Sequence, residues 1–333
     1  MSLFIHNAQV FLGNRLEKTN IVIADGTIVD ITEELVTCEE YIDAEGCVVI
    51  PGMIECDGKG DLLGCMEALK GGITTVILDH EPKKDKAYTN FWWHHKIKNE
   101  SAEEIRGVKE AASVRLNPLD ITQEKREATI RRLQNNAKRA SVTAIGETAL
   151  FAIQAAKEGK GRLYISSVGE EIKQVKKANK QKLFLEVKSH ALENGKVLEC
   201  LKKGLVDTIS SEDLAGGLTT VLRHVEKKDI SIAEAVALTS TNPSNIFGMK
   251  KKGAIEIGND ADLTICKTGK ECSINIVIVN GIAAYFRGEI KGKFGKSYKE
   301  EKDELPDEAS ENEQPHMPGF GPGDREDTHQ GKD

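Results

Sequence analysis

The sequence predicts an α/β protein: a (β/α)8 barrel of the TIM type, with a small β-sandwich domain built from both termini. Two observations predict this fold. Eight short apolar segments alternate with segments of helical periodicity between residues 51 and 247. Strand-like segments also lie on both sides of this middle region, where they can pair with each other. A chain of 333 residues is long enough for both units.

The two ends of the chain have the alternation of apolar and polar residues that is typical of β-hairpins. It covers most of residues 1–50 and returns at 261–266 and 276–286. Asn280-Gly281 in the last segment is a strong signal for a two-residue hairpin turn. We therefore expect the two ends to form one composite sheet domain.

The middle region alternates apolar runs, typical of buried strands, with amphipathic helical stretches. Right-handed connections between parallel strands make closure into a barrel natural. The predicted strands are residues 52–56, 73–79, 87–92, 113–116, 141–145, 162–166, 182–187 and 206–210. The predicted helices are residues 123–139, 147–157, 170–178 and 191–203.

The chain therefore divides into three predicted regions. Residues 1–50 and 248–294 form the small β domain, and residues 51–247 form the barrel. Residues 295–333 are charged, rich in Pro and Gly and nearly free of aliphatic side chains. Such a segment cannot bury enough apolar surface to offset its ordering entropy, so we expect a disordered acidic tail.

Composition excludes several classes of function. The net charge of −7 argues against a nucleic-acid-binding protein. No apolar run approaches the ~20 residues of a membrane span, and the N-terminus lacks the pattern of a signal peptide. The seven cysteines are scattered without a CxxC pair, which favours reduced thiols and a cytoplasmic location.

Three motifs resemble those of dihydroorotases and dihydropyrimidinases (hydantoinases) in the amidohydrolase superfamily. Residues 44–54, AEGCVVIPGMI, are similar to the family's D-A-x-G-x-x-V-x-P-G-x-I-D before strand one. Residues 71–76, GGITTV, match G-G-x-T-T-V at strand two. Residues 241–248 and 252–263 are similar to the N-P-A-x-x-x-G and G-x-I-x-x-G-x-D-A-D-L segments that return the chain to the small domain. The resemblance covers residues 1 to about 295 and implies a distorted barrel with a small β-sandwich.

The resemblance also implies one or two divalent metals at the carboxyl-terminal mouth of the barrel, where metal-bound water would attack a cyclic amide. The family's H-x-H pair after strand one corresponds here to Asp57 and Lys59, and its strand-four lysine to Arg115. The catalytic aspartate after strand eight corresponds to Glu212, with Asp213 beside it. Protonated lysine and guanidinium are not metal ligands, so we expect no metal and no other cofactor.

These degenerate positions lead to a specific structural expectation. Lys59 and Arg115 should take the place of the metal charges. Their predicted partners are Asp57 and Glu212. Among the remaining histidines, His80 between Asp79 and Glu81 is the best metal candidate if a single Zn ion is bound instead.

The resemblance leads to a first hypothesis, a catalytically inactive homologue, or pseudoenzyme, that acts as a structural or regulatory partner. The implied partners are a second copy of the chain in a homo-oligomer and another protein such as aspartate transcarbamoylase or an active amidohydrolase. The alternative is a hydrolase of cyclic amide C–N bonds with a one-metal or metal-free site, using Asp57, Glu212 or Asp213 as base. A third hypothesis is a protein that binds a small ligand in the old pocket.

Overall fold

The computed structural model describes residues 1–58, 64–82, 88–97, 111–144, 146–175, 180, 182–267 and 272–290. Lys59 and the predicted acidic tail, 295–333, lie outside the described residues. Within those ranges no helix is long and apolar enough to cross a membrane.

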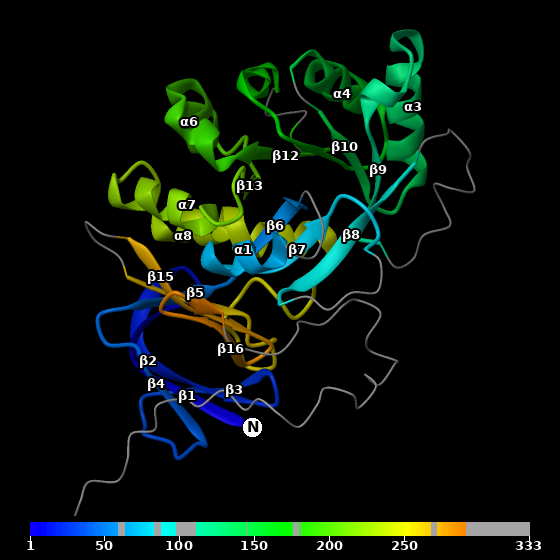
Figure 1. Cartoon of the computed structure of the whole chain (residues 1–333). Helices are drawn as coiled ribbons and strands as arrows, with labels where there is room; N and C mark the ends of the chain where they lie inside the picture. Colours follow the sequence, from blue (N-terminus) through cyan, green and yellow to red (C-terminus); the bar gives the residue numbers. More distant parts are fainter. Residues whose placement is uncertain are drawn as a thin grey trace, which may run out of the picture.

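Eight parallel strands within the described residues form the predicted barrel (Figure 1). They are β6 (Met53–Gly58), β7 (Ile73–Leu78), β8 (Asn90–Lys96), β9 (Ser113–Leu116), β10 (Ala140–Thr143), β11 (Leu163–Ser166), β12 (Leu183–Lys188) and β13 (Thr208–Ser210). They follow one another in sequence order, each paired in parallel with the next. Each predicted strand overlaps one of them, which confirms the (β/α)8 fold.

The barrel is closed at its seam by a side chain. The order of paired strands runs from β6 to β13, and these two outermost strands are not joined by a ladder in the part of the chain that is described. A carboxylate oxygen of Glu55 on β6 accepts a hydrogen bond from the backbone N–H of Ser211, just beyond β13, at 2.6 Å. Glu55 therefore connects the two edges that the backbone leaves unpaired.

Helices cover the outside of the barrel, as Figure 1 shows for α3, α4 and α6. The α-helices are α1 (Gly64–Lys70), α3 (Gln123–Asn136), α4 (Glu147–Glu158), α6 (Gly195–Lys202), α7 (Gly217–Glu226), α8 (Ile232–Val236) and α9 (Asn242–Phe247). The shorter helical turns are η1 (Pro118–Asp120), η2 (Glu170–Gln174), η3 (Ser189–Glu193) and the π-type η4 (Ala237–Thr241).

Two of the four predicted helices match α3 and α4 closely, and the other two differ. The predicted helix at 170–178 begins as the 3-10 turn η2, and residues 176–179 lie outside the description. The predicted helix at 191–203 is divided into η3 and α6 at Asn194, whose side chain caps α6 by accepting from the N–H of Lys196. A capping residue starts a new helix because its side chain replaces a missing backbone partner.

Both ends of the described chain form a second sheet. Its strands are β1 (Ser2–Leu12), β2 (Arg15–Ala24), β3 (Thr27–Thr32), β4 (Glu40–Asp43), β5 (Val48–Pro51), β14 (Leu263–Lys267), β15 (Ser273–Val279), β16 (Ile282–Phe286) and β17 (Glu289–Ile290). The antiparallel pair of β5 and β14 joins the two ends, with Ile50 opposite Thr264. The sheet has its own apolar core, which includes Ile5, Ile21 and Ile278. This core is separate from that of the barrel.

A buried polar network fastens this sheet to the barrel. The side-chain amide of Asn90 on β8 donates to both carboxylate oxygens of Asp262, at 3.0 and 2.9 Å. Asn280, in the β15–β16 turn, donates from its side chain to Asn90 at 2.7 Å and from its backbone to Asp262 at 2.9 Å. The ammonium of Lys252 also pairs with Asp262. The contact between the sheet and the barrel therefore includes the buried carboxylate of Asp262, whose hydrogen bonds and ion pair add to the apolar packing.

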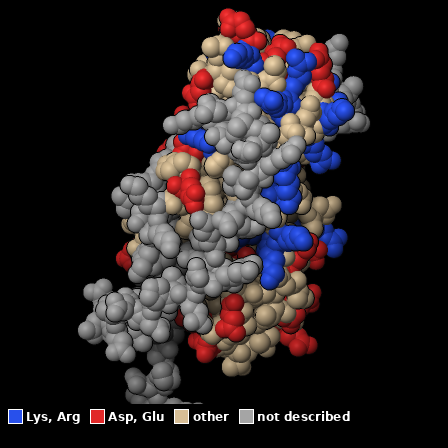
Figure 2. All heavy atoms as spheres, turned by 90° about the vertical axis from the view of Figure 1, so that its right-hand side faces the viewer, with Lys and Arg blue, Asp and Glu red and all other residues tan. Residues whose placement is uncertain are grey.

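The surface of the molecule carries both signs of charge. On the face in Figure 2, Lys and Arg side chains run in a column along the right of the view, and Asp and Glu gather above and below it. Such a mixed surface agrees with the small net charge of −7 over 333 residues.

Candidate functional site

Five charged side chains meet inside the barrel toward the carboxyl ends of its strands, and we call them the central charge cluster. Glu55 and Asp57 come from β6, Arg115 from β9, and Glu186 and Lys188 from β12. Each is at most 6% exposed. Residues two apart on a strand point to the same side, so Glu186 and Lys188 face inward while Leu185 and Val187 pack in the core under the helices.

Asp57 is the centre of the cluster. One oxygen of its carboxylate accepts from Arg115 Nη1 at 2.5 Å, and the other accepts from Lys188 Nζ at 3.1 Å. Ser167 Oγ, just past β11, donates to the second oxygen at 3.4 Å. Burial favours the neutral acid, but the charges of Arg115 and Lys188 outweigh it and hold the pKa of Asp57 well below its usual range. Asp57 is therefore a permanent anion between two cations.

Glu186 forms the second half of the cluster. Its oxygens accept from the hydroxyls of Tyr164 and Ser210, each at 2.5 Å, and Lys188 Nζ lies 3.4 Å away. Tyr164 in turn lies 2.9 Å from Thr208 Oγ1. Burial disfavours the ammonium of Lys188, but the carboxylates around it, Glu186 foremost, raise its pKa. Lys188 is therefore a charged lysine held between two acids.

Glu55 differs from Asp57 and Glu186 because, among the described residues, no cation forms an ion pair with it. Its carboxylate accepts from the backbone N–H of Asp57 at 3.0 Å and from that of Ser211 at 2.6 Å. Complete burial raises the pKa of Glu55 to about 7, and the negative charge of Glu186 adds to this effect. Glu55 is thus the acid of the cluster that changes charge near neutral pH.

A chain of hydrogen bonds leads from the cluster across the barrel to His94. Arg115 Nε donates to Ser141 Oγ at 3.3 Å, Ser141 lies 2.7 Å from Ser113, and Ser113 lies 2.7 Å from His94 Nδ1. His94 Nε2 is 2.9 Å from the carbonyl oxygen of Cys56, which can only accept. Burial and then Arg115 lower the pKa of His94 well below its usual value, so its ring is neutral. The proton therefore sits on Nε2, and each hydroxyl in the chain donates toward Nδ1.

These residues do not fit the divalent metals of the family they resemble. Both oxygens of Asp57 are engaged by cations, and both ring nitrogens of His94 are engaged by hydrogen bonds. Arg115 and Lys188 bring positive charge where a metal would need anionic or neutral donors. Among the described residues, no group of three His, Cys, Asp or Glu side chains is placed to hold a metal ion.

The structure brings together only part of the predicted site. The predicted pairing of Arg115 with Asp57 is present at the cluster. Glu212, the other predicted partner, has a side chain that is 59% exposed and lies 3.7 Å from His190 Nδ1 instead. Asp213 is also exposed, and its carboxylate accepts from the backbone N–H of Ala215. Both acids lie outside the barrel because β13 ends at Ser210 and the chain then turns outward.

His80, the metal candidate of the single-zinc alternative, is also a surface residue. Its Nδ1 lies 2.5 Å from Asp79, whose carboxylate also accepts from Lys96 at 2.7 Å. Burial would raise the pKa of Asp79, but the hydrogen bond from Lys96 lowers it overall. The carboxylate beside His80 is therefore already paired with a cation.

Sequence reasoning missed Glu55, Glu186 and Lys188. A signal for them exists in the sequence. LFLEVK of β12 and MIECDG of β6 each place two charged residues at alternate positions of an otherwise apolar strand. In a barrel strand, that alternation indicates charges that face the interior.

Comparison with known proteins agrees with this fold. The model of the amidohydrolase family matches residues 196–283. A dihydroorotase of Methanosphaera stadtmanae is 42% identical over 71 residues, which are 19% of this chain and 17% of the relative. An allantoinase of Escherichia coli is 35% identical over 85 residues, 22% of this chain and 19% of the relative. These matches thus span less than a fifth of the curated relatives' own length.

Solved structures resemble the chain over most of its length. The dihydropyrimidinase of Brevibacillus agri superposes with a TM-score of 0.78 at 16% identity, over 89% of this chain and 98% of that one. At this identity, the likeness shows a shared fold. A D-hydantoinase structure has a TM-score of 0.77 at 17% identity over the same shares of the two chains. The fold of this chain is therefore similar to that of dihydropyrimidinase and D-hydantoinase.

Proposed function

We propose that this chain is a catalytically inactive homologue of the amidohydrolases and acts as a structural or regulatory partner. The observation that supports this best is the placement of Arg115 and Lys188 on either side of Asp57. Asp57 and Arg115 occupy two positions where the resemblance places metal-site residues, and both pair with each other or with Lys188 instead of being available as ligands.

The burial of the cluster also favours a structural role. Asp57 is 4% exposed and Lys188 is 6% exposed, so a substrate would have to displace paired charges to reach them. A general base must reach its water and must hold a pKa near the working pH. Asp57 meets neither requirement, because its oxygens are occupied and its pKa is lowered.

The partner in this proposal is a second protein, either another copy of this chain or an enzyme such as aspartate transcarbamoylase or an active amidohydrolase. A (β/α)8 barrel with a rigid, ion-paired interior keeps its outer helices in fixed positions. Those helices and the small β domain are then free to serve as docking surfaces.

Elemental analysis of full-length protein, expressed in medium with added zinc and manganese, tests the proposal first. We expect less than about 0.1 metal per chain, because the cluster offers cations where ligands are needed. The same preparation should not hydrolyse dihydroorotate, hydantoin or allantoin. An Escherichia coli allantoinase, prepared in the same way, serves as the matched positive control for metal loading and turnover.

One or two metals per chain, or turnover of any of these cyclic amides, would overturn the proposal and support the altered hydrolase instead. Light scattering after size-exclusion chromatography tests the partner role. A stable homo-oligomer, or co-elution with purified aspartate transcarbamoylase, would support it. A monomer that binds neither transcarbamoylase nor an active amidohydrolase would argue against it.

A further inference from the structure

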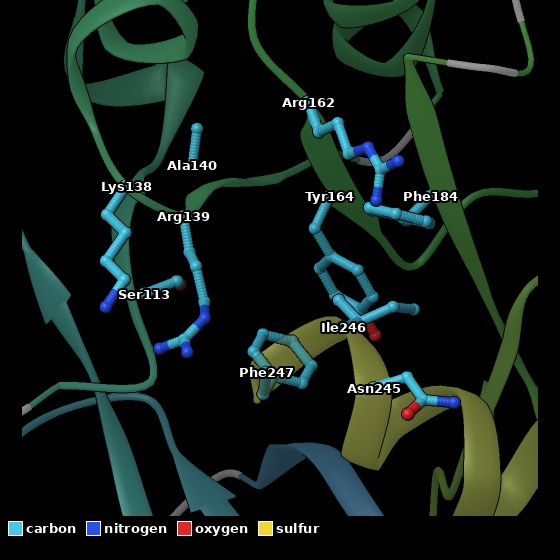
Figure 3. A pocket seen from close by; sticks show the side chains of 10 residues that line it. All are labelled: Ser113, Lys138, Arg139, Ala140, Arg162, Tyr164, Phe184, Asn245, Ile246 and Phe247. Atoms are coloured by element: carbon cyan, nitrogen blue, oxygen red, sulfur yellow. The ribbon is translucent and has the colours of Figure 1, made fainter. Parts of the chain in front are cut away.

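A cavity lies at the opposite end of the barrel from the central charge cluster. Its lining includes Ser113 and Ala140, the first residues of β9 and β10, and Arg162, which directly precedes β11. Because parallel strands all begin at one end, this is the amino-terminal end of the barrel. The cavity has a volume of about 200 Å³, and α9 lies beneath it (Figure 3).

Three basic residues line this cavity: Lys138, Arg139 and Arg162. Figure 3 shows Lys138 and Arg139 on one side and Arg162 on the other. No acidic residue is among the lining residues. Within the described part of the chain, no ion pair neutralises Lys138 or Arg162. Two such cations at one cavity raise the local potential and attract an anion, and Arg139 adds a second guanidinium to the lining.

Packing fixes two of these cations in place. A Cβ atom on Gly248, the left-handed residue that ends α9, would lie 2.1 Å from Arg139 Nη2, so the guanidinium sits directly against the end of that helix. Helix carboxyl termini attract cations. The guanidinium of Arg162 lies over the ring of Phe184, 5.4 Å from its centre. Both guanidinium groups are thus positioned by neighbours that stay in place when an anion binds.

Flat apolar surfaces form the rest of the cavity. Tyr164 and Phe247 meet edge to face, with ring centres 5.0 Å apart, and Phe184 and Ile246 complete the wall. The side chain of Asn245 adds an amide that can donate or accept. A ligand that fills this space needs an apolar, ring-sized body as well as a negative charge.

We propose that this pocket binds a phosphate monoester of a ring-sized apolar group. A phosphate dianion matches the cations better than a carboxylate does, because its oxygens accept from several donors at once and guanidinium groups bind it in a bidentate manner. The ring would lie against Phe184 and Ile246, the half-buried apolar side chains of the lining. The site is separate from the metal-binding end of related barrels and does not depend on whether the chain is catalytically active.

Isothermal titration calorimetry with phenyl phosphate, on the full-length protein in low-salt buffer, tests the proposal. We expect one site per chain, and the double variant Lys138→Ala/Arg162→Ala should bind at least about tenfold more weakly because two charge-assisted contacts are lost. Both side chains are exposed, so the variant should keep its fold. Inorganic phosphate should bind more weakly than phenyl phosphate, since it gains nothing from the aromatic wall.

The matched control is Lys125→Ala/Lys202→Ala, which removes the same charge from exposed positions on α3 and α6. It should change the affinity less than about twofold, as expected of screened, distant charges. No measurable binding of phenyl phosphate, or an equal loss in the control, would overturn the proposal. Equal affinity for inorganic phosphate would refute the role of the apolar wall.

Discussion

Replacing Lys188 with methionine should destabilise the protein by about 3–5 kcal/mol, the usual cost of breaking a buried ion pair from one side. The ammonium lies 3.1 Å from Asp57 and 3.4 Å from Glu186. At an effective dielectric constant of about 20, each contact contributes roughly 5 kcal/mol of attraction. Desolvation of the buried ammonium opposes this attraction by several kcal/mol. Methionine keeps an unbranched stem close to that of lysine and lacks only the ammonium, so the loss mainly reports the charge.

Urea denaturation at pH 8, followed by circular dichroism, measures this free energy of unfolding. Lys202→Met removes an exposed lysine on α6 and should stay within about 0.5 kcal/mol of the parent protein. In an Asp57→Asn background, Lys188→Met should cost at least about 1 kcal/mol less than it does alone, because contacting residues are coupled. A cost below about 1 kcal/mol for the single variant would refute the view that this pair organises the barrel.

Three further variants test other features of the fold. Burial raises the pKa of Glu55 from its ordinary 4.5 to about 7, so it takes up a proton on folding and its contribution to stability is lost as pH rises. Stability of the parent should therefore fall by roughly 3 kcal/mol from pH 5 to pH 8, and Glu55→Gln should remove this slope in urea titrations; an unchanged slope would contradict it. Ser231→Ala removes the capping box of α8 and should cost about 1 kcal/mol in thermal unfolding, and no change would mean that the cap is dispensable. Gly52→Ala should cost about 1–3 kcal/mol, because its Cβ would lie 2.1 Å from a buried methyl of Thr74, whereas Gly195→Ala, which meets nothing within 4 Å, should be neutral.

The barrel could be predicted from sequence because its strands are buried on both faces. Such strands appear as short apolar runs, and the prediction of residues 113–116 coincides with β9. The strands of the small β domain were equally predictable from the alternation of apolar and polar residues in both of its segments. The division between η3 and α6 was not, because it depends on the side chain of Asn194 rather than on periodicity.

The site was harder to predict than the fold. The family resemblance led to Asp57 and Arg115, which lie on β6 and β9 and form an ion pair across the barrel interior. The same resemblance led to Glu212, which follows the end of β13, the last barrel strand, and is exposed to solvent. Lys188 was missed because none of the three family motifs includes this part of the chain. The inward direction of a charged residue depends on strand register, which a motif does not specify.

The hydrogen-bond chain from Arg115 to the carbonyl oxygen of Cys56 has a consequence for proton movement. A guanidinium that keeps its protons at physiological pH fixes one end, and an oxygen that can only accept fixes the other. Every hydrogen between them has one permitted position. A proton shuttle needs hydrogen bonds whose donors and acceptors can exchange roles, and the bonds of this chain cannot, so it moves protons in neither direction. Ser141→Ala would interrupt the path in the middle, but the imidazole of His94 would keep its proton on Nε2, because the carbonyl oxygen of Cys56 can only accept.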